Sequence, residues 1–216
     1  MKKIDINDWA RRVPYENFIK YSDPIFSISA RLDVTSICEQ CAAEKTSFFA
    51  NMLYVVSYVM NTTEEFRLRL RDGEVVCFDA VDPNYIVMTE DGVIVTCRTE
   101  YTEDHTEFYA RVRADIDRMK RAGTRNKSFN VSGENNCFYV SCLPWLDFTA
   151  VSNPYNLTDP DNCSIPRVTW GKFVDENGRK KMTLDIAAHH ALLDGEPVCR
   201  VFNTIQDKIN QKGFFK

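Results

Sequence analysis

The stretch from residue 183 to residue 209 constrains the fold most, because the spacing of its apolar residues changes once along it. Apolar residues alternate with their neighbours through 183–188, a period of two that is typical of a strand. From Val198 to Ile209 they recur at helical spacing, and Pro197 suits a first helical turn, where its missing N–H is no loss. The sequence therefore predicts a strand, a tight turn and a C-terminal helix in that order.

The turn spans residues 189–195 and reads His-His-Ala-Leu-Leu-Asp-Gly. No serine-centred or cysteine-centred nucleophile motif lies near it, so a histidine here suits a general base that acts on the hydroxyl of a substrate. The pattern favours direct transfer between two bound substrates. A structural interpretation stays open, in which one histidine is packed, the other is on the surface and Asp-Gly is a common turn. We expect no metal, because adjacent residues on a strand point to opposite faces, so His189 and His190 cannot easily share an ion.

Length and composition favour a single soluble domain over residues 1–216. With 44% hydrophobic and 27% charged residues, the chain can bury a sizeable core, and it contains no apparent linker or repeat. No stretch approaches the roughly 18 uninterrupted apolar residues of a membrane span, and the polar N-terminal residues do not resemble a signal core. We therefore expect a cytoplasmic protein with no membrane partner.

The charge pattern argues against a nucleic-acid partner. The net charge is −4 and no basic stripe is sustained, while the short basic cluster at 120–127 is typical of a helix end and loop. Eight cysteines occur in a chain larger than the small disulfide-stapled scaffolds, so we expect free thiols. Cys38 and Cys41 have redox or metal spacing, but they fall in an expected helix without a second such pair, which favours packing.

The remaining periodicities predict an α+β fold, in which a mixed β-sheet is covered by helices. Helices are expected over 36–58 and 106–121, and strands over 67–70, 75–80, 86–88, 93–99, 138–141, 169–174 and 182–188. Turn signals at Asp72-Gly73, Asp91-Gly92 and Asn177-Gly178 separate several of these strands.

Several segments resemble the chloramphenicol acetyltransferase family. Residues 189–195 match its His-His-Ala-x-x-Asp-Gly signature, and 9–12 are similar to its Trp-x-Arg-Arg opening. The segments 26–35, 65–69, 79–83 and 140–145 are similar to family landmarks in order and spacing. The likeness extends over nearly the whole chain. It implies the two-layer sandwich of the CoA-dependent acyltransferases and acetyl-CoA as co-substrate.

The resemblance also implies roles for individual residues. His190 matches the general base that takes the proton from the acceptor hydroxyl, and Ser141 matches the hydrogen-bond donor to the oxyanion. Thr169 matches a threonine that supports the same intermediate through water. Asp194 would pair with Arg11 and lock the turn beneath the base, although the residues alone leave Arg11 open as a solvated surface charge. For the neighbouring histidine of the pair, packing is the default.

The coenzyme site and the acceptor site resemble those of the family to different degrees. Lys172-Phe173 resembles the Lys-Tyr pair at the coenzyme tunnel of the family, with Trp145 nearby in the pattern. On the acceptor side, residues 13–18 depart from the family pattern. Phe18 stands where the family has a hydrogen-bonding tyrosine.

Two further acceptor-site residues are expected, Pro24 and Phe26. The proline stands where several members of the family have a pocket cysteine. Chloramphenicol is the leading acceptor, and other alcohols remain open.

The size of the chain bears on its assembly. Larger enzymes with a similar histidine motif use two such domains to enclose one channel, whereas this chain supplies one. The resemblance implies a homotrimer with active sites at subunit interfaces, in which His190 faces an acceptor pocket built largely by a neighbour.

The leading hypothesis is an acetyl-CoA-dependent chloramphenicol O-acetyltransferase, an antibiotic-resistance enzyme. The first alternative is a same-fold acyltransferase with another hydroxyl acceptor or acyl donor. This includes the core of a 2-oxoacid dehydrogenase complex, although no lipoyl-bearing domain or flexible linker is apparent. The second alternative is a non-catalytic trimeric binding protein.

Overall fold

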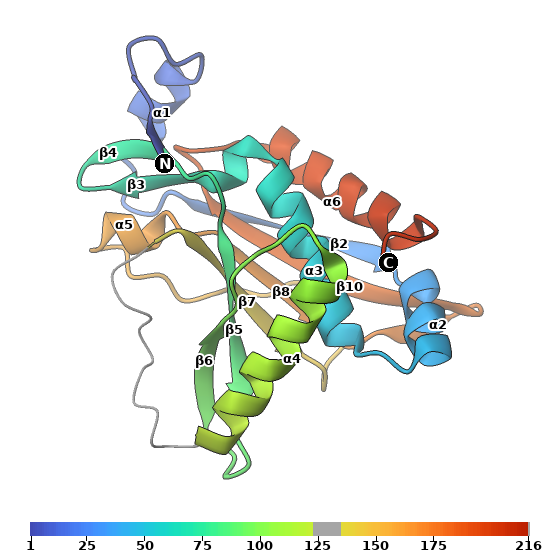
Figure 1. Ribbon diagram of the computed structural model, residues 1–216. Helices are drawn as coiled ribbons and strands as arrows, with labels where there is room; N and C mark the ends of the chain where they lie inside the picture. The colour runs from blue at the N-terminus through green and yellow to red at the C-terminus, as the bar shows by residue number, and fades with distance from the viewer. Residues whose placement is uncertain (123–134, 216) are drawn as a thin grey trace.

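The computed structural model describes residues 1–122 and 135–215, so most of the basic cluster at 120–127 lies outside the described residues. Within them, the main sheet has the strand order β2-β10-β8-β7-β5-β6, and β9 pairs with β10 (Figure 1). The strands of this sheet are β2 (Ile25–Asp33), β5 (Asp82–Met88), β6 (Ile94–Arg98), β7 (Cys137–Leu143), β8 (Arg167–Gly171), β9 (Val174–Glu176) and β10 (Arg179–His189).

Four longer helices cover one face of this sheet (Figure 1). They are α2 (Thr35–Glu44), α3 (Phe48–Thr62), α4 (His105–Ala122) and α6 (Gly195–Asn210). The helix α3 contacts α2, α4, α6 and β5, which explains why it is apolar on most of its surface. The inner face of α6 buries the apolar residues with helical spacing, and each such side chain contributes about 1.5–3 kcal/mol to folding.

A smaller sheet with the order β1-β4-β3 lies beside the main one. Its strands are β1 (Lys2–Lys3), β3 (Leu68–Arg71) and β4 (Glu74–Cys77), and it packs near the short helix α1 (Arg12–Phe18). A 3-10 turn, η1 (Glu64–Arg67), and the short helix α5 (Pro160–Cys163) complete the described elements. No helix of the described chain has the length and apolar character needed to cross a bilayer.

The register of the main sheet places one polar row across four strands. Ser141 of β7 pairs with Thr169 of β8, Thr169 pairs with Asp185 of β10, and Asp185 pairs with Ser29 of β2. The residues on either side of this row along each strand are apolar and pack against the helices. Since side chains alternate along a strand, the polar row lies on the face that the four helices leave uncovered.

Most of the expected elements are confirmed, with two corrections. The expected helix over 36–58 is wrong, because the chain breaks between α2 and α3 at Lys45, where φ is +54°. Ser47 then caps α3 by accepting a hydrogen bond from the Ala50 N–H. Apolar spacing continues across this break, so periodicity alone did not reveal it.

The expected strand over 169–174 is also wrong in its bounds. The strand β8 ends at Gly171, and the Lys172 N–H donates to the Leu146 carbonyl at 2.9 Å instead of extending the sheet. The next strand, β9, belongs to a hairpin with β10, whose turn residues Asn177 and Gly178 both have positive φ. All eight cysteines are free thiols, as predicted.

Candidate active site

His190 lies directly after β10, with its imidazole between two aromatic rings. Its backbone N–H donates to the Pro24 carbonyl at 2.8 Å. The Phe18 ring stacks on the imidazole at 3.8 Å between centroids, and the Phe26 ring lies tilted at 4.5 Å. The Nδ1 atom is buried 3.3 Å from Asp194 Oδ1 and makes no hydrogen bond to the described residues, while 30% of the side chain is exposed. The ring is thus fixed in place but open to a substrate.

Arg11 binds the turn that carries His190. Its two terminal nitrogens donate to the two carboxylate oxygens of Asp194, one of them at 2.9 Å. The same guanidinium donates to the carbonyls of His190, at 2.6 Å, and Ala191, at 3.3 Å. Asp194 is the N-cap residue of α6 but makes no capping hydrogen bond, because its carboxylate binds Arg11. A single side chain therefore fixes both the turn and the start of the helix.

The ion pair with Arg11 keeps the pKa of Asp194 below its ordinary value. We expect Asp194→Asn to lower the free energy of unfolding at pH 7, because an amide forms no charge-assisted pair with the guanidinium. A carboxylate whose pKa is depressed in the folded state stabilises that state above its ordinary pKa of 3.8, and this contribution is lost as the pH falls through the lower folded value.

Denaturant unfolding at pH 7 and pH 3 measures this effect. The gap in unfolding free energy between the wild type and Asp194→Asn should narrow at the lower pH. Asp117→Asn, on the exposed side of α4, is the matched control and should show little change at either pH. A gap of the same size at both pH values contradicts the ion-pair explanation.

His189, the other histidine of the pair, is buried and points away from His190 into the protein. Burial, together with the nearby His190, lowers the pKa of His189 to about 4. Its Nδ1 accepts a hydrogen bond from the Ala191 N–H at 3.2 Å. These contacts fit the packing role that was the default for this residue.

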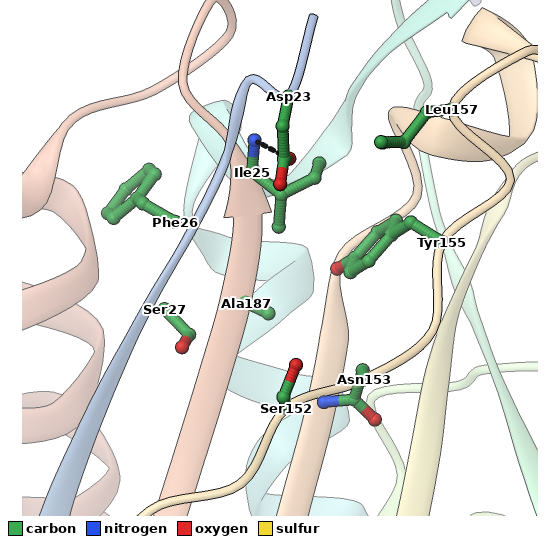
Figure 2. Close-up of a pocket in the computed structure, with 9 residues that line it drawn as sticks. All are labelled: Asp23, Ile25, Phe26, Ser27, Ser152, Asn153, Tyr155, Leu157 and Ala187. Carbon is green, nitrogen blue, oxygen red and sulfur yellow. Dashed lines mark hydrogen bonds between the residues drawn. The ribbon is translucent and has the colours of Figure 1, made fainter.

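Ser141 and Thr169 lie side by side on the uncovered face of the sheet. Ser141 is half-buried, and Thr169 is buried with its hydroxyl 3.4 Å from the Asn153 amide. Ser141 lines a pocket of about 310 Å³ together with Asn153. A second pocket, of about 200 Å³, also includes Asn153 and is bounded by Ala187 of β10 and by the first residues of β2 (Figure 2). The two hydroxyls thus lie where a small substrate has room to bind.

One of the expected coenzyme residues, Trp145, lines another pocket, of about 710 Å³, which Ser141 also lines. Trp145, with 71% of its surface exposed, and Phe48 form part of the wall. The Phe173 ring lies 5.3 Å from Phe48, next to this pocket. The helix α4 adds two basic side chains, Arg113 and Lys120, to the lining.

The loop after β7 is held against the end of β8. The backbone of Lys172 binds the carbonyl of Leu146, and the Lys172 side chain is exposed. At Gly171 a Cβ would lie 2.8 Å from that same carbonyl and 3.0 Å from the Phe148 ring. Only glycine permits this close approach. The approach holds the loop that carries Trp145, whose side chain lines the pocket.

Ser141 and His190 of one chain do not meet. His190 lies five residues beyond Asp185, the β10 residue in the row of Ser141, which corresponds to about 16 Å along an extended strand. The His190 ring contacts Phe26, which packs on the helix side of the sheet, whereas Ser141 is on the uncovered side. A base and an oxyanion donor must each approach the reacting group to about 3 Å. One chain therefore holds two separated parts of the expected site.

Sequence reasoning missed Asn153 and Arg167, which line the same pocket as Ser141. The segment around Asn153 has no periodicity, so no signal marked it. Arg167 is two residues before Thr169 in a strand and therefore on the same face, which was a usable signal. In the described chain no group of three or more metal-ligating side chains comes together.

Residues 1–206 match the family model for chloramphenicol acetyltransferase. The chain belongs to the chloramphenicol acetyltransferase family. A chloramphenicol acetyltransferase of Campylobacter coli is 32% identical to it over 97% of this chain and 98% of that protein. A solved chloramphenicol acetyltransferase structure has a TM-score of 0.86 at 27% identity, covering 100% of this chain and 99% of the other.

Membership of the chloramphenicol acetyltransferase family confirms the predicted enzyme class, an acyltransferase, and the predicted α+β fold. A dihydrolipoamide acetyltransferase of Azotobacter vinelandii is also similar, with a TM-score of 0.66 at 16% identity. That match covers 91% of this chain and 85% of the other and shows a shared fold alone. The family match includes the signature at 189–195.

Proposed function

We propose that this enzyme transfers the acetyl group of acetyl-CoA to a hydroxyl of chloramphenicol. The observation that carries the proposal is the partly exposed imidazole of His190, which lies between Phe18 and Phe26 on a turn that Arg11 clamps, in a member of this family. The match of residues 1–206 to the chloramphenicol acetyltransferase family model supports acetyl-CoA as the donor and chloramphenicol as the acceptor.

His190 acts as the general base in this proposal. Its Nδ1 is buried, so Nε2 takes the proton as the acceptor hydroxyl oxygen bonds to the thioester carbonyl carbon. Ser141 donates its O–H to the oxyanion that forms, and Thr169 supports the same intermediate through water. As the carbon–sulfur bond breaks, the coenzyme A sulfur receives the proton from the imidazolium, and His190 returns to its neutral form. No acyl-enzyme is needed.

The separation of His190 from Ser141 supports a site made by two copies of the chain. We infer a homotrimer with three sites at its interfaces, in which His190 of one subunit faces Ser141 of a neighbour. A ring of three copies closes without exposed ends. The face of the main sheet that the four helices leave uncovered is the surface that a neighbour would cover, and Ser141 and Ser29, at the two ends of its polar row, are half-buried.

The pocket of about 710 Å³ is our candidate for the coenzyme. Trp145 and Phe173 offer apolar surface to the pantetheine arm, and Lys172 is exposed beside them. Arg113 and Lys120 supply positive charge for phosphate groups. The acetyl end would then lie near Ser141, which lines the same pocket.

The acceptor would bind against the aromatic residues that flank His190, namely Phe18 and Phe26, with Pro24 behind them. We place the enzyme in the cytoplasm as a single folded unit over residues 1–216 that needs no metal. The eight free thiols are typical of that compartment. An acyltransferase with a different hydroxyl acceptor is the second candidate, because Arg167 puts a charge in the pocket of Ser141.

The test is the release of coenzyme A thiol from acetyl-CoA with and without chloramphenicol. We expect thiol release that depends on the antibiotic, with one molecule of acetylated product formed for each thiol released. Blank reactions without acetyl-CoA correct for the eight thiols of the protein. A folded protein that binds acetyl-CoA but releases no antibiotic-dependent thiol would show that the acceptor is another alcohol.

A further inference from the structure

Arg167 lines the pocket of Ser141 without a counter-ion among the described residues. It is the one charged side chain among the described residues that line this pocket of about 310 Å³. The side chain is half-buried, its Nε is inaccessible to solvent, and it forms no hydrogen bond or ion pair with the described residues. Burial lowers the pKa of Arg167. Withdrawing part of a charge from water without a counter-ion lowers the stability of the fold.

Two tyrosines hold the guanidinium in place. Its carbon lies 3.8 Å from the centre of the Tyr155 ring and 5.4 Å from that of Tyr139. These contacts engage the face of the guanidinium and leave its N–H groups for another partner. Asp185 of the neighbouring strand β10 accepts a hydrogen bond from Ser29 at 2.6 Å, and the described residues show no ion pair between Asp185 and Arg167.

The walls around Arg167 carry further polar atoms without partners. The Tyr155 hydroxyl is buried and makes no hydrogen bond to the described chain, and neither does Oδ2 of Asp185. Figure 2 shows Tyr155, Asn153 and Ser152 on one loop facing Ala187 of β10, and Arg167 is the register partner of Ala187 on β8. Arg167 lines the pocket of Ser141, whereas Tyr155 and Ser152 line the pocket of about 200 Å³, and Asn153 lines both.

We propose that Arg167 of one subunit, in the pocket of Ser141 that would face His190 of a neighbour, makes the acceptor site selective for alcohols that carry a carboxylate. The inference rests on the proposed function, because it assigns the acceptor of the same acetyl transfer. A guanidinium binds a planar two-oxygen group through two parallel hydrogen bonds. The aromatic nitro group of chloramphenicol has the same planar shape without the full charge, so the antibiotic fits the same position less strongly.

The test uses two analogues of chloramphenicol, one with a carboxylate in place of the nitro group and one with the corresponding methyl ester. The wild type should acetylate the carboxylate with the higher kcat/KM. Arg167→Gln should lower kcat/KM for the carboxylate by about 10- to 100-fold, the value of charge-assisted hydrogen bonds, and leave the ester within about threefold. Arg167→Lys keeps the charge and should retain part of the preference. Arg200→Gln, an exposed arginine on α6, is the matched control.

Equal losses on both analogues, or no loss with Arg167→Gln, would overturn the inference. Dissociation of the oligomer in the variant, seen by light scattering, would also overturn it, because Arg167 would then pair with a neighbouring copy. Calorimetric binding of the carboxylate analogue separates failure of this inference from failure of the proposed function. If the wild type acetylates no acceptor, carboxylate binding that Arg167→Gln abolishes still supports the site, and absence of binding rejects it.

Discussion

Replacing His190 by alanine is expected to lower kcat for chloramphenicol acetylation by about 10²–10⁴-fold, the usual contribution of a positioned general base. The variant removes the group that takes the proton, while the clamp of Arg11 on Asp194 and the carbonyls of the turn stays intact. Acetyl-CoA affinity should be unchanged, since the coenzyme pocket lies on other elements. Steady-state thiol release and calorimetric titration of acetyl-CoA measure the two effects separately.

Two further variants make the result for His190 specific. His190→Gln keeps most of the volume between Phe18 and Phe26, so it distinguishes loss of the base from collapse of the aromatic stack. Cys199→Ala, an exposed position on α6, should behave as the wild type. A loss of less than tenfold in both His190 variants would mean that another group, or water, takes the proton.

Replacing Ser141 by alanine is expected to lower kcat by about 10²–10³-fold, the usual effect of losing one donor to an oxyanion. The KM values for both substrates should change little, because the hydrogen bond strengthens only as charge develops on the carbonyl oxygen. Thr169 lies beside Ser141 in the register of β7 and β8 and remains in place. Steady-state kinetics with each substrate varied in turn measures kcat and KM separately.

Ser36→Ala, on the exposed surface of α2, is the matched serine-to-alanine control and should leave both constants unchanged. Thermal unfolding of Ser141→Ala should match that of the wild type, because the hydroxyl makes no hydrogen bond to the part of the chain that the structure describes. A rise in KM with an unchanged kcat would assign Ser141 to substrate binding and remove it from the transition state.

Local periodicity was enough to predict the elements that carry the site. The alternation through 183–188 follows from a strand with one face on the helices and one on the polar row, and the structure has β10 there. The helix after Asp194 was equally predictable from the sequence, because its buried residues recur at helical spacing. The motif of 189–195 then identified the turn between the two elements as the place of the chemistry.

Features that depend on contacts between distant segments could not be read from the sequence. The break at Lys45 leaves the apolar spacing intact, and the end of β8 is set by the Leu146 carbonyl from another loop. The pocket around Arg167 combines strands and a loop without periodicity. The separation of His190 from Ser141 follows from the pairing register, which no local pattern encodes.

A complementation experiment tests most directly whether His190 of one copy works with Ser141 of another. Chains carrying His190→Ala and chains carrying Ser141→Ala are co-expressed in equal amounts, and the mixed trimers are assayed for chloramphenicol-dependent thiol release. With random assembly, about one quarter of the interfaces in a ring of three combine an intact histidine with an intact serine. The predicted activity is therefore about a quarter of wild type, far above either variant alone. Activity in the mixture no higher than that of the two separate variants would contradict the shared site.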